Sequence, residues 1–211
     1  ELFSSLGMTS KSKSILLNGS GVDLEKFYIS PLPEDPVFLC MSRLIKSKGL
    51  LDYANAAKIV KSSYPNARFL LYGFPDDHED SIDESEIIET WKARYGIEYF
   101  GFTNDPVKTI SLCSVYVLLS YNEGTPRSVL EAMAMGRPII TTDVPGCRET
   151  VMEDKNGILA NLRDPNSAAQ AMISLLDGDL RKKMSINSRR LCEEKYDVHL
   201  VNELIMSSLK I

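Results

Sequence analysis

The stretch Val115–Asp143, VYVLLSYNEGTPRSVLEAMAMGRPIITTD, contains a strand, a helix and a second strand in close succession. Residues 115–120 are apolar along most of their length, which is typical of a strand that is buried on both faces of a sheet, and residues 137–143 form a second β-rich run. Residues 126–135, between them, follow a Gly-Thr-Pro turn and have a helical pattern of apolar side chains. This order predicts a right-handed crossover between two parallel strands.

The same alternation of strands and helices continues along the chain in both directions. Two helices without a strand are expected from about Leu180 to Leu209. The predicted fold class is α/β, a doubly wound, Rossmann-like parallel sheet with terminal helices. The further strands are expected at 14–18, 37–42, 67–73, 97–102 and 157–160, and the further helices at 49–64, 83–95, 106–113 and 165–177.

Composition narrows the class of protein. The chain has 211 residues, 44% of them apolar and 25% charged, as in an ordinary globular domain. Its net charge of −5 argues against a nucleic-acid surface, and no apolar run reaches the length of a membrane helix. Cys40, Cys113, Cys147 and Cys192 have no metal-binding or redox spacing, so we expect buried thiols in a reducing, cytoplasmic compartment.

The loop Ser42–Gly49, SRLIKSKG, follows the apolar strand 37–42. In doubly wound sheets, ligands bind beyond the carboxyl ends of the strands. Arg43 and Lys48 add two cations at the mouth of the next helix, whose N-terminus also favours anions. Together they suit a diphosphate, although loops of this kind are also often basic for solubility. Lys46 is expected to be a solvated charge.

A second loop, beginning at Glu123, follows the strand 115–120. Thr125 is expected to be the N-cap of the next helix and Pro126 its first residue. Gly124 permits close approach of a ligand to the backbone. The free N–H groups of such a turn, with Glu123 as an acceptor, suit a hydroxyl-rich molecule. The alternative is that Glu123 is a surface acid near a helix N-terminus.

Glu131 lies inside that helix among apolar side chains. An unpaired buried charge would cost several kcal/mol, so the carboxylate requires a partner. A structural ion pair is one possibility. The other is a ligand diol such as that of ribose, because a carboxylate can accept two hydrogen bonds from neighbouring hydroxyls.

Some other polar residues are not assigned to the site. The acidic segment PDDHED, 75–80, has the look of a metal-binding triplet but is expected to be a solvated loop. His78 and His199 are given no role. A glycoside hydrolase is a different interpretation, in which Glu123 and Glu131 would be the pair of catalytic carboxylates. We do not favour it, because one acid is on a turn and the other in the following helix.

These motifs carry a family resemblance. Glu123 and Glu131, with seven residues between them and followed by AMAMGRPIITTD, resemble the signature of retaining GT-B glycosyltransferases of family 4. SRLIKSKG resembles the basic loop of that family and LLNGSGVDLEKF, 16–27, its interdomain entry. GFTNDP, 101–106, and PGCRETV, 145–151, are in the expected places. The resemblance extends from about Leu16 to the C-terminus and is nearest to bacterial capsular, O-antigen and exopolysaccharide transferases.

The resemblance implies roles for individual residues. Arg43 and Lys48 would hold the diphosphate of a nucleotide-sugar and stabilise the leaving group. Glu131 would bind ribose, and Glu123 with the amides beside it would bind the donor sugar. Arg43, Lys48 and Glu123 are therefore the expected catalytic residues, and Glu131 is an expected donor-binding residue. The other expected donor-binding residues are Gly101, Phe102 and Thr103 along the nucleobase, Gly124, Thr125 and Pro126 at the sugar, and Asn18 and Gly19 near the cleft.

The resemblance also implies a mechanism and partners. It implies front-face attack with retention, in which the departing diphosphate helps to deprotonate the acceptor, without a metal ion or cofactor. The donor would be a UDP-sugar carrying a hexose or N-acetylhexosamine, and the acceptor a saccharide or a lipid-linked saccharide. The product would belong to a surface polysaccharide.

The chain does not begin with Met and is expected to be the C-terminal, donor-binding half of a longer protein. Residues 1–13 would be a linker or the tail of an N-terminal domain, 14–179 the nucleotide-sugar domain, and 180–211 the terminal helices. The N-terminal domain would supply the acceptor site and any peripheral membrane contact. This half alone is expected to be inactive, and its last helix, from Val198, to expose apolar surface.

Other functions use the same fold. An NAD-type oxidoreductase would need a G-x-G-x-x-G fingerprint, but NGSGVD has no third glycine that opens a helix. A nucleotide-binding module without transferase activity is a further alternative, although Arg43, Lys48, Glu123 and Glu131 are all present. A sugar phosphorylase or a GT-B epimerase also stays open. The sequence does not indicate the sugar, the nucleobase, the acceptor and linkage, or the oligomeric state.

Overall fold

The structure, a computed structural model, describes residues 6–7, 17–77 and 79–209. The expected linker 1–13 lies almost wholly outside these residues, as do His78 and the first part of the expected strand 14–18. Leu17 and Asn18, which are described, are not in a strand. The other expected strands are all present.

The strands form one parallel sheet in the order β3-β2-β1-β4-β5-β6. The chain moves outward from β1 to β2 and β3, and then returns to place β4 on the other side of β1. The boundary between β1 and β4 is therefore the topological switch point, beside which ligands bind in such sheets. The strands are β1 (Val37–Met41), β2 (Arg68–Tyr72), β3 (Ile97–Tyr99), β4 (Val115–Leu118), β5 (Ile139–Thr142) and β6 (Gly157–Ala160).

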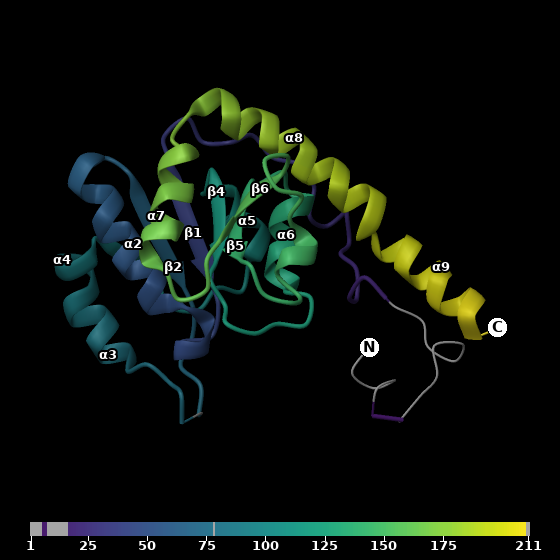
Figure 1. Cartoon of the computed structure of the whole chain (residues 1–211), viewed down its shortest axis with the longest axis horizontal. Coiled ribbons are helices and arrows are strands. Elements are labelled where there is room, and N and C mark those ends of the chain that lie inside the picture. The colour runs from purple at the N-terminus through teal and green to yellow at the C-terminus, as the bar shows by residue number, and fades with distance from the viewer. Residues whose placement is uncertain (1–5, 8–16, 78, 210–211) are drawn as a thin grey trace.

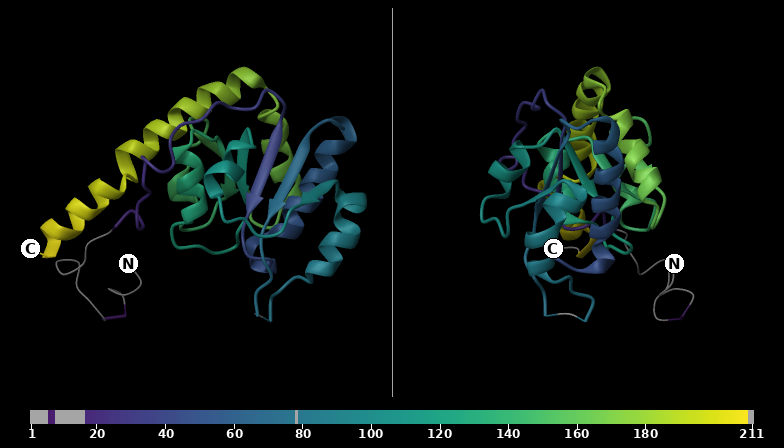
Figure 2. Two further views of the ribbon diagram at one scale, coloured as in Figure 1. Left: turned by 180° about the vertical axis from the view of Figure 1, so that it is seen from behind. Right: turned by 90° about the vertical axis from the view of Figure 1, so that its left-hand side faces the viewer.

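Helices cover both faces of the sheet and bury two separate hydrophobic clusters against it (Figures 1 and 2). One face carries α2 (Leu50–Ser63), α7 (Pro165–Ser174) and the stretch formed by α3 (Glu84–Glu86), η3 (Ile87–Trp91) and α4 (Lys92–Tyr95). The other carries α5 (Pro106–Ser111), α6 (Arg127–Ala134) and α8 (Gly178–Lys195). The doubly wound prediction is confirmed. The expected helix 83–95 contains one π-helical segment, η3.

The two terminal helices are also confirmed. Helix α8 packs on α6, where Ser188 Oγ donates a hydrogen bond of 2.7 Å to the carbonyl oxygen of Arg137. Helix α9 (Val198–Leu209) runs away from the sheet (Figure 1). It exposes Leu200, Leu204 and Met206, as expected for the last helix. The division of the chain at residue 179 stays a prediction.

Several observed strands end before the predicted ones because their last residues leave the sheet to form loops. The loops after β1, β4 and β5 then pack tightly against one another. Gly49, with φ of 66°, lies against the carbonyl group of Leu119, and Gly146, with φ of 87°, lies against the carbonyl oxygen of Gly124. A β-carbon at either glycine would overlap these atoms, so glycine is required at both positions.

Candidate functional site

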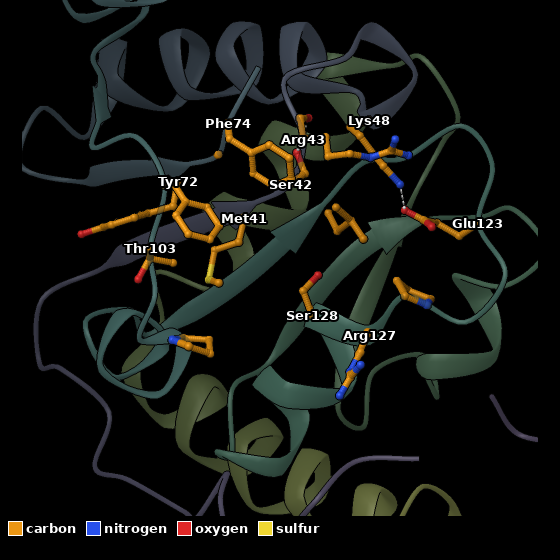
Figure 3. Close-up of a pocket in the computed structure, with 15 residues that line it drawn as sticks. Met41, Ser42, Arg43, Lys48, Tyr72, Phe74, Thr103, Glu123, Arg127 and Ser128 are labelled. Atoms are coloured by element: carbon orange, nitrogen blue, oxygen red, sulfur yellow. Dashed lines mark hydrogen bonds and ion pairs between the residues drawn. The ribbon is translucent and has the colours of Figure 1, made fainter. Parts of the chain in front are cut away.

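A cavity of about 330 Å³ lies at the carboxyl ends of β1, β2 and β4, at the switch point of the sheet (Figure 3). Cationic and acidic side chains lie on one side of it and aromatic side chains on the other. This is a suitable arrangement for a ligand with an anionic part and a flat apolar part.

The two expected cations both line the cavity, and each has a carboxylate partner. Arg43 Nη1 lies 2.5 Å from Asp76 Oδ2, and Lys48 Nζ lies 2.5 Å from Glu123 Oε1. Only about one sixth of the Lys48 and Glu123 side chains is exposed, at 16% and 15%. An anionic ligand that binds Lys48 therefore has to share this cation with Glu123, or separate the pair.

The acidic loop 75–80 was expected to be solvated, and this is wrong for its first and last acids. Besides the Arg43–Asp76 pair, the carboxylate of Asp80 accepts a hydrogen bond of 2.8 Å from the Ser47 N–H. The carbonyl oxygen of Asp80 accepts another, of 2.9 Å, from the Lys46 N–H. The acidic loop thus braces the basic loop. The exposed side chain of Lys46 agrees with its expected solvation.

Helix α6 begins one residue later than expected. Pro126 has an extended conformation, with φ of −70° and ψ of 112°, and is the N-cap in place of Thr125. The reason is that the helical hydrogen bonds start from the carbonyl oxygen of Pro126, which accepts from the N–H groups of Val129 and Leu130. No side chain caps this end. Because Pro126, Arg127 and Ser128 line the cavity, the uncapped first turn lies at its wall.

Glu131 is mostly buried, as its apolar neighbours predicted, with 14% of its side chain exposed. Its ion-pair partner is Arg127, with Nε 3.7 Å from Oε1. Burial raises the pKa of Glu131, against the smaller effects of Arg127 and Lys26, which lower it. The carboxylate is not among the groups that line the cavity and lies one turn behind those that do. The ion pair expected for Glu131 is therefore present, but it is weak.

The aromatic side of the cavity was largely missed by the sequence analysis. Phe74 and Phe102 meet edge to face with ring centroids 5.5 Å apart, and are 42% and 62% exposed. Tyr72 also lines the cavity and stacks on Phe100 at 5.1 Å. Exposed rings on a cavity wall are a typical surface for stacking a flat ligand. The signal was the pattern of alternate aromatic residues at the end of β2, in FLLYGF.

The structure thus brings part of the expected site together. Of the expected residues, those that line the cavity are Arg43, Lys48, Phe102, Thr103, Glu123 and Pro126. Those outside its lining are Asn18, Gly19, Gly101, Gly124, Thr125 and Glu131, although Gly19 packs against the Thr125 side chain. The lining residues that were not expected are Met41, Ser42, Tyr72, Gly73, Phe74, Pro106, Leu118, Arg127 and Ser128.

Two further sequence predictions concern metals and membranes. All four cysteines are buried and free, as expected. Among the residues that the structure describes, no three His, Cys, Asp or Glu side chains are grouped to hold a metal ion. In the same part of the chain, every helix is too short or too polar to span a bilayer.

Comparison with known proteins identifies the family. Residues 24–191, most of the chain, match the family model of glycosyl transferases group 1. The chain belongs to this family. This glycosyltransferase domain is 27% identical to N,N'-diacetylbacillosaminyl-diphospho-undecaprenol alpha-1,3-N-acetylgalactosaminyltransferase of Campylobacter jejuni, over 89% of this chain and 52% of that enzyme. It is 28% identical to the capsular polysaccharide biosynthesis glycosyltransferase CapM of Staphylococcus aureus, over 87% of this chain and 48% of the relative.

The glycosyltransferase domain therefore spans about half the length of these relatives. Among solved structures, Anabaena Alr3699/HepE in complex with UDP superposes with a TM-score of 0.78, at 20% identity, over 90% of this chain and 56% of that one. The Rossmann-like α/β fold is that of GT-B glycosyltransferases. The predicted fold is thus confirmed, and so is membership of glycosyl transferases group 1, whereas retention and family 4 stay predictions. The relatives include enzymes of polysaccharide biosynthesis.

Proposed function

We propose that this domain binds the nucleotide-sugar donor, a UDP-sugar, of a retaining glycosyltransferase of family 4. The main support for this proposal is the cavity at the switch point, with Arg43 and Lys48 on one side and exposed aromatic rings on the other. The diphosphate would lie against the two cations and the uncapped first turn of α6, which together supply charge and N–H donors.

The nucleobase would lie on the aromatic side, along Phe102, Thr103 and the ring of Phe74. Stacking on side chains would then add to the backbone contacts expected along Gly101–Thr103. UDP is the proposed nucleotide because a protein of the same fold was solved with it, and because the chain resembles surface-polysaccharide transferases. Glu131 would bind the ribose hydroxyls, as the weakness of its ion pair permits.

In the proposed reaction Arg43 and Lys48 stabilise the charge that grows on the diphosphate as it leaves. Glu123 holds hydroxyls of a hexose or N-acetylhexosamine. The acceptor hydroxyl attacks the anomeric carbon of this sugar from the face that the diphosphate leaves, the bond to the diphosphate breaks, and the departing diphosphate helps to take the proton of the hydroxyl. No metal ion or cofactor is needed. A further, N-terminal domain supplies the site for the saccharide or lipid-linked acceptor at the cytoplasmic face of the membrane, so this domain alone binds donor without transferring sugar.

A ligand panel tests the nucleotide assignment. Isothermal calorimetry and thermal shift on this domain would compare UDP, GDP, ADP and NAD, followed by UDP-galactose and UDP-N-acetylgalactosamine. The proposal expects UDP to bind most tightly and to raise the melting temperature in a concentration-dependent way. Preference for NAD would favour an oxidoreductase and end the transferase proposal.

Variants of one loop test the diphosphate assignment. Arg43→Ala should weaken UDP binding by at least about tenfold, because a charge-assisted contact to phosphate is lost. Lys46→Ala is the matched control, since this lysine is in the same loop but exposed. In the longer protein, Arg43→Ala should also lower turnover. Equal UDP affinity and full turnover in both variants would contradict the assignment.

A further inference from the structure

Tyr121 connects the two loops that carry the ion pair of the cavity. Its backbone N–H donates a hydrogen bond of 2.8 Å to the carbonyl oxygen of Ser47, in the basic loop. Its hydroxyl donates another, of 2.9 Å, to Asp52 Oδ2, in the first turn of α2. Both partners flank Lys48, and Tyr121 itself is two residues before Glu123. One residue therefore links the two sides of the Lys48–Glu123 pair.

A third segment covers this link. The guanidinium of Arg163, in the loop before α7, lies 4.8 Å from the centre of the Tyr121 ring. Arg163 has φ of 56°, a left-handed conformation that is uncommon and costly for a residue other than glycine. Burial and the bond to Asp52 raise the pKa of Tyr121 to about 12, so its hydroxyl stays a donor at neutral pH.

The position of the Glu123 carboxylate depends on this arrangement. Glu123 Oε1 accepts from Ser120 Oγ at 2.8 Å and from Lys48 Nζ at 2.5 Å. Ser120 and Glu123 belong to the loop that Tyr121 fixes, whereas Lys48 belongs to the basic loop and α2. The distance between the two loops therefore decides whether Glu123 stays in reach of Lys48 and of a ligand in the cavity at the same time.

We propose that Tyr121 is a positioning residue. The hydrogen bond from its hydroxyl to Asp52 holds Glu123 at the position where its carboxylate contacts the sugar of the donor. This inference rests on the proposed function, in which Glu123 binds that sugar. It assigns to Tyr121 and Asp52 an effect on the sugar part of donor recognition, and little effect on the nucleotide part, whose ligands come from the basic loop, the aromatic wall and α6.

The test compares two dissociation constants measured by calorimetry on this domain. One is for UDP, and the other is for whichever of UDP-galactose and UDP-N-acetylgalactosamine binds the wild type more tightly. Their ratio, Kd of UDP over Kd of the UDP-sugar, isolates the contribution of the sugar. A loss of stability alone would weaken both ligands together and leave the ratio unchanged.

Tyr121→Phe keeps the ring and its contact with Arg163 but loses the hydroxyl. It should lower the ratio by about five- to tenfold, the net effect of one hydrogen bond, while Kd for UDP changes less than about twofold. Asp52→Ala should do the same, and the double variant should be no worse than either single one. Asp52→Asn keeps an acceptor for the hydroxyl and should retain the ratio.

Glu123→Ala separates this inference from the function on which it rests. If Glu123→Ala lowers the ratio but Tyr121→Phe and Asp52→Ala do not, the positioning role is wrong and the donor site stands. If Glu123→Ala leaves the ratio unchanged, Glu123 does not bind the sugar, and the role of Tyr121 falls with it. A ratio that Asp52→Asn lowers as much as Asp52→Ala would also contradict the role of the hydroxyl bond.

Discussion

Two buried charged side chains of the α6 region, Arg137 and Glu131, differ in how many hydrogen bonds and ion pairs the protein provides for them. Arg137, just after the helix, has no exposed surface. Its Nε donates to the carbonyl oxygen of Ile110 at 3.2 Å, and its Nη1 to that of Ser30 at 3.0 Å. Glu131, in the middle of the helix, keeps 14% of its side chain exposed, and its ion pair is with an exposed arginine at 3.7 Å.

The difference separates a structural charge, Arg137, from Glu131, which has fewer protein partners and which we propose binds the ribose. A buried ion is tolerated when its hydrogen bonds are complete, and then it fixes the segments that supply them. Arg137 fixes the segment before β1 in this way. Glu131 and the uncapped first turn have fewer protein partners, so the N-terminal end of α6 can bind a ligand without first losing strong internal contacts.

The largest expected effect is at the C-terminal end. Arg137→Ala would remove the donors of several buried carbonyl groups and leave a void, which should lower the free energy of unfolding by about 3–5 kcal/mol. Denaturation by urea measures this loss. Arg190→Ala is the control, because its side chain is 71% exposed and its partner Glu194 lies at the surface. If the two variants were equally stable, Arg137 would not hold the structure together.

Gly146→Ala should have the next largest effect, in the loop that packs against Gly124 just before α6. A β-carbon there would overlap the carbonyl oxygen of Gly124 and strain a backbone with φ of 87°. We expect a loss of stability of about 2 kcal/mol or more and weaker binding of UDP-sugars, because the loop of Glu123 must move.

Gly96→Ala is the matched control for Gly146→Ala. Its φ is 74°, but a β-carbon there would meet only the flexible side chain of Lys61. Strain alone should cost about 1 kcal/mol, without an effect on ligand affinity. Equal effects of the two substitutions on UDP-sugar binding would show that the contact with Gly124 does not position the loop.

Glu131→Gln should affect stability and binding in opposite directions. Because burial raises the pKa of Glu131, the folded state holds its proton more tightly than the unfolded state. Ionisation of Glu131 therefore costs stability as the pH rises through this pKa. At pH 7 the neutral glutamine should raise the free energy of unfolding, and at pH 3, where the carboxyl is protonated in both states, the gain should disappear.

The same variant should weaken UDP binding by about tenfold if the carboxylate holds the ribose hydroxyls. Calorimetry at pH 7 measures this loss. A variant that is less stable at pH 7 and still binds UDP normally would make Glu131 a structural charge like Arg137. The two residues would then not differ in role.

The sequence predicted the central layers of this fold well. Runs such as VFLCM and VYVL are apolar throughout because both faces of the strand are covered, and the structure buries almost all of their side chains. Local composition also located Arg43, Lys48 and Glu123 at strand ends. It did not locate the start of α6, because the usual Thr-Pro pattern was overridden by the hydrogen bonds of the Pro126 carbonyl group.

The partners of the charged residues could not be predicted in the same way. Asp76 is within an acidic run that has the composition of a solvated loop. It meets Arg43, 33 residues earlier, because β2 pairs with β1 in the register that sets Tyr72 beside Met41. The same pairing brings Tyr72 and Phe74 to the cavity. Such contacts depend on strand order and register, which the local sequence around Asp76 does not contain.

Arg127→Ala should have the smallest effect and gives the sharpest test of the contrast. The Arg127 side chain is 78% exposed, so its loss should change the free energy of unfolding by less than about 0.5 kcal/mol. Arg127 is among the residues that line the cavity, and UDP affinity should fall severalfold at low salt and less at high salt, because exposed charges are screened.

Measuring UDP binding at two salt concentrations for Arg127→Ala and Glu131→Gln compares the two residues directly. A buried carboxylate that bonds ribose should keep most of its effect in salt, whereas an exposed cation should not. If Arg127→Ala weakened binding more than Glu131→Gln at both concentrations, the arginine would be the ligand-binding group. Glu131 would then serve to orient it, and the charge available to the ligand at this end of α6 would be positive.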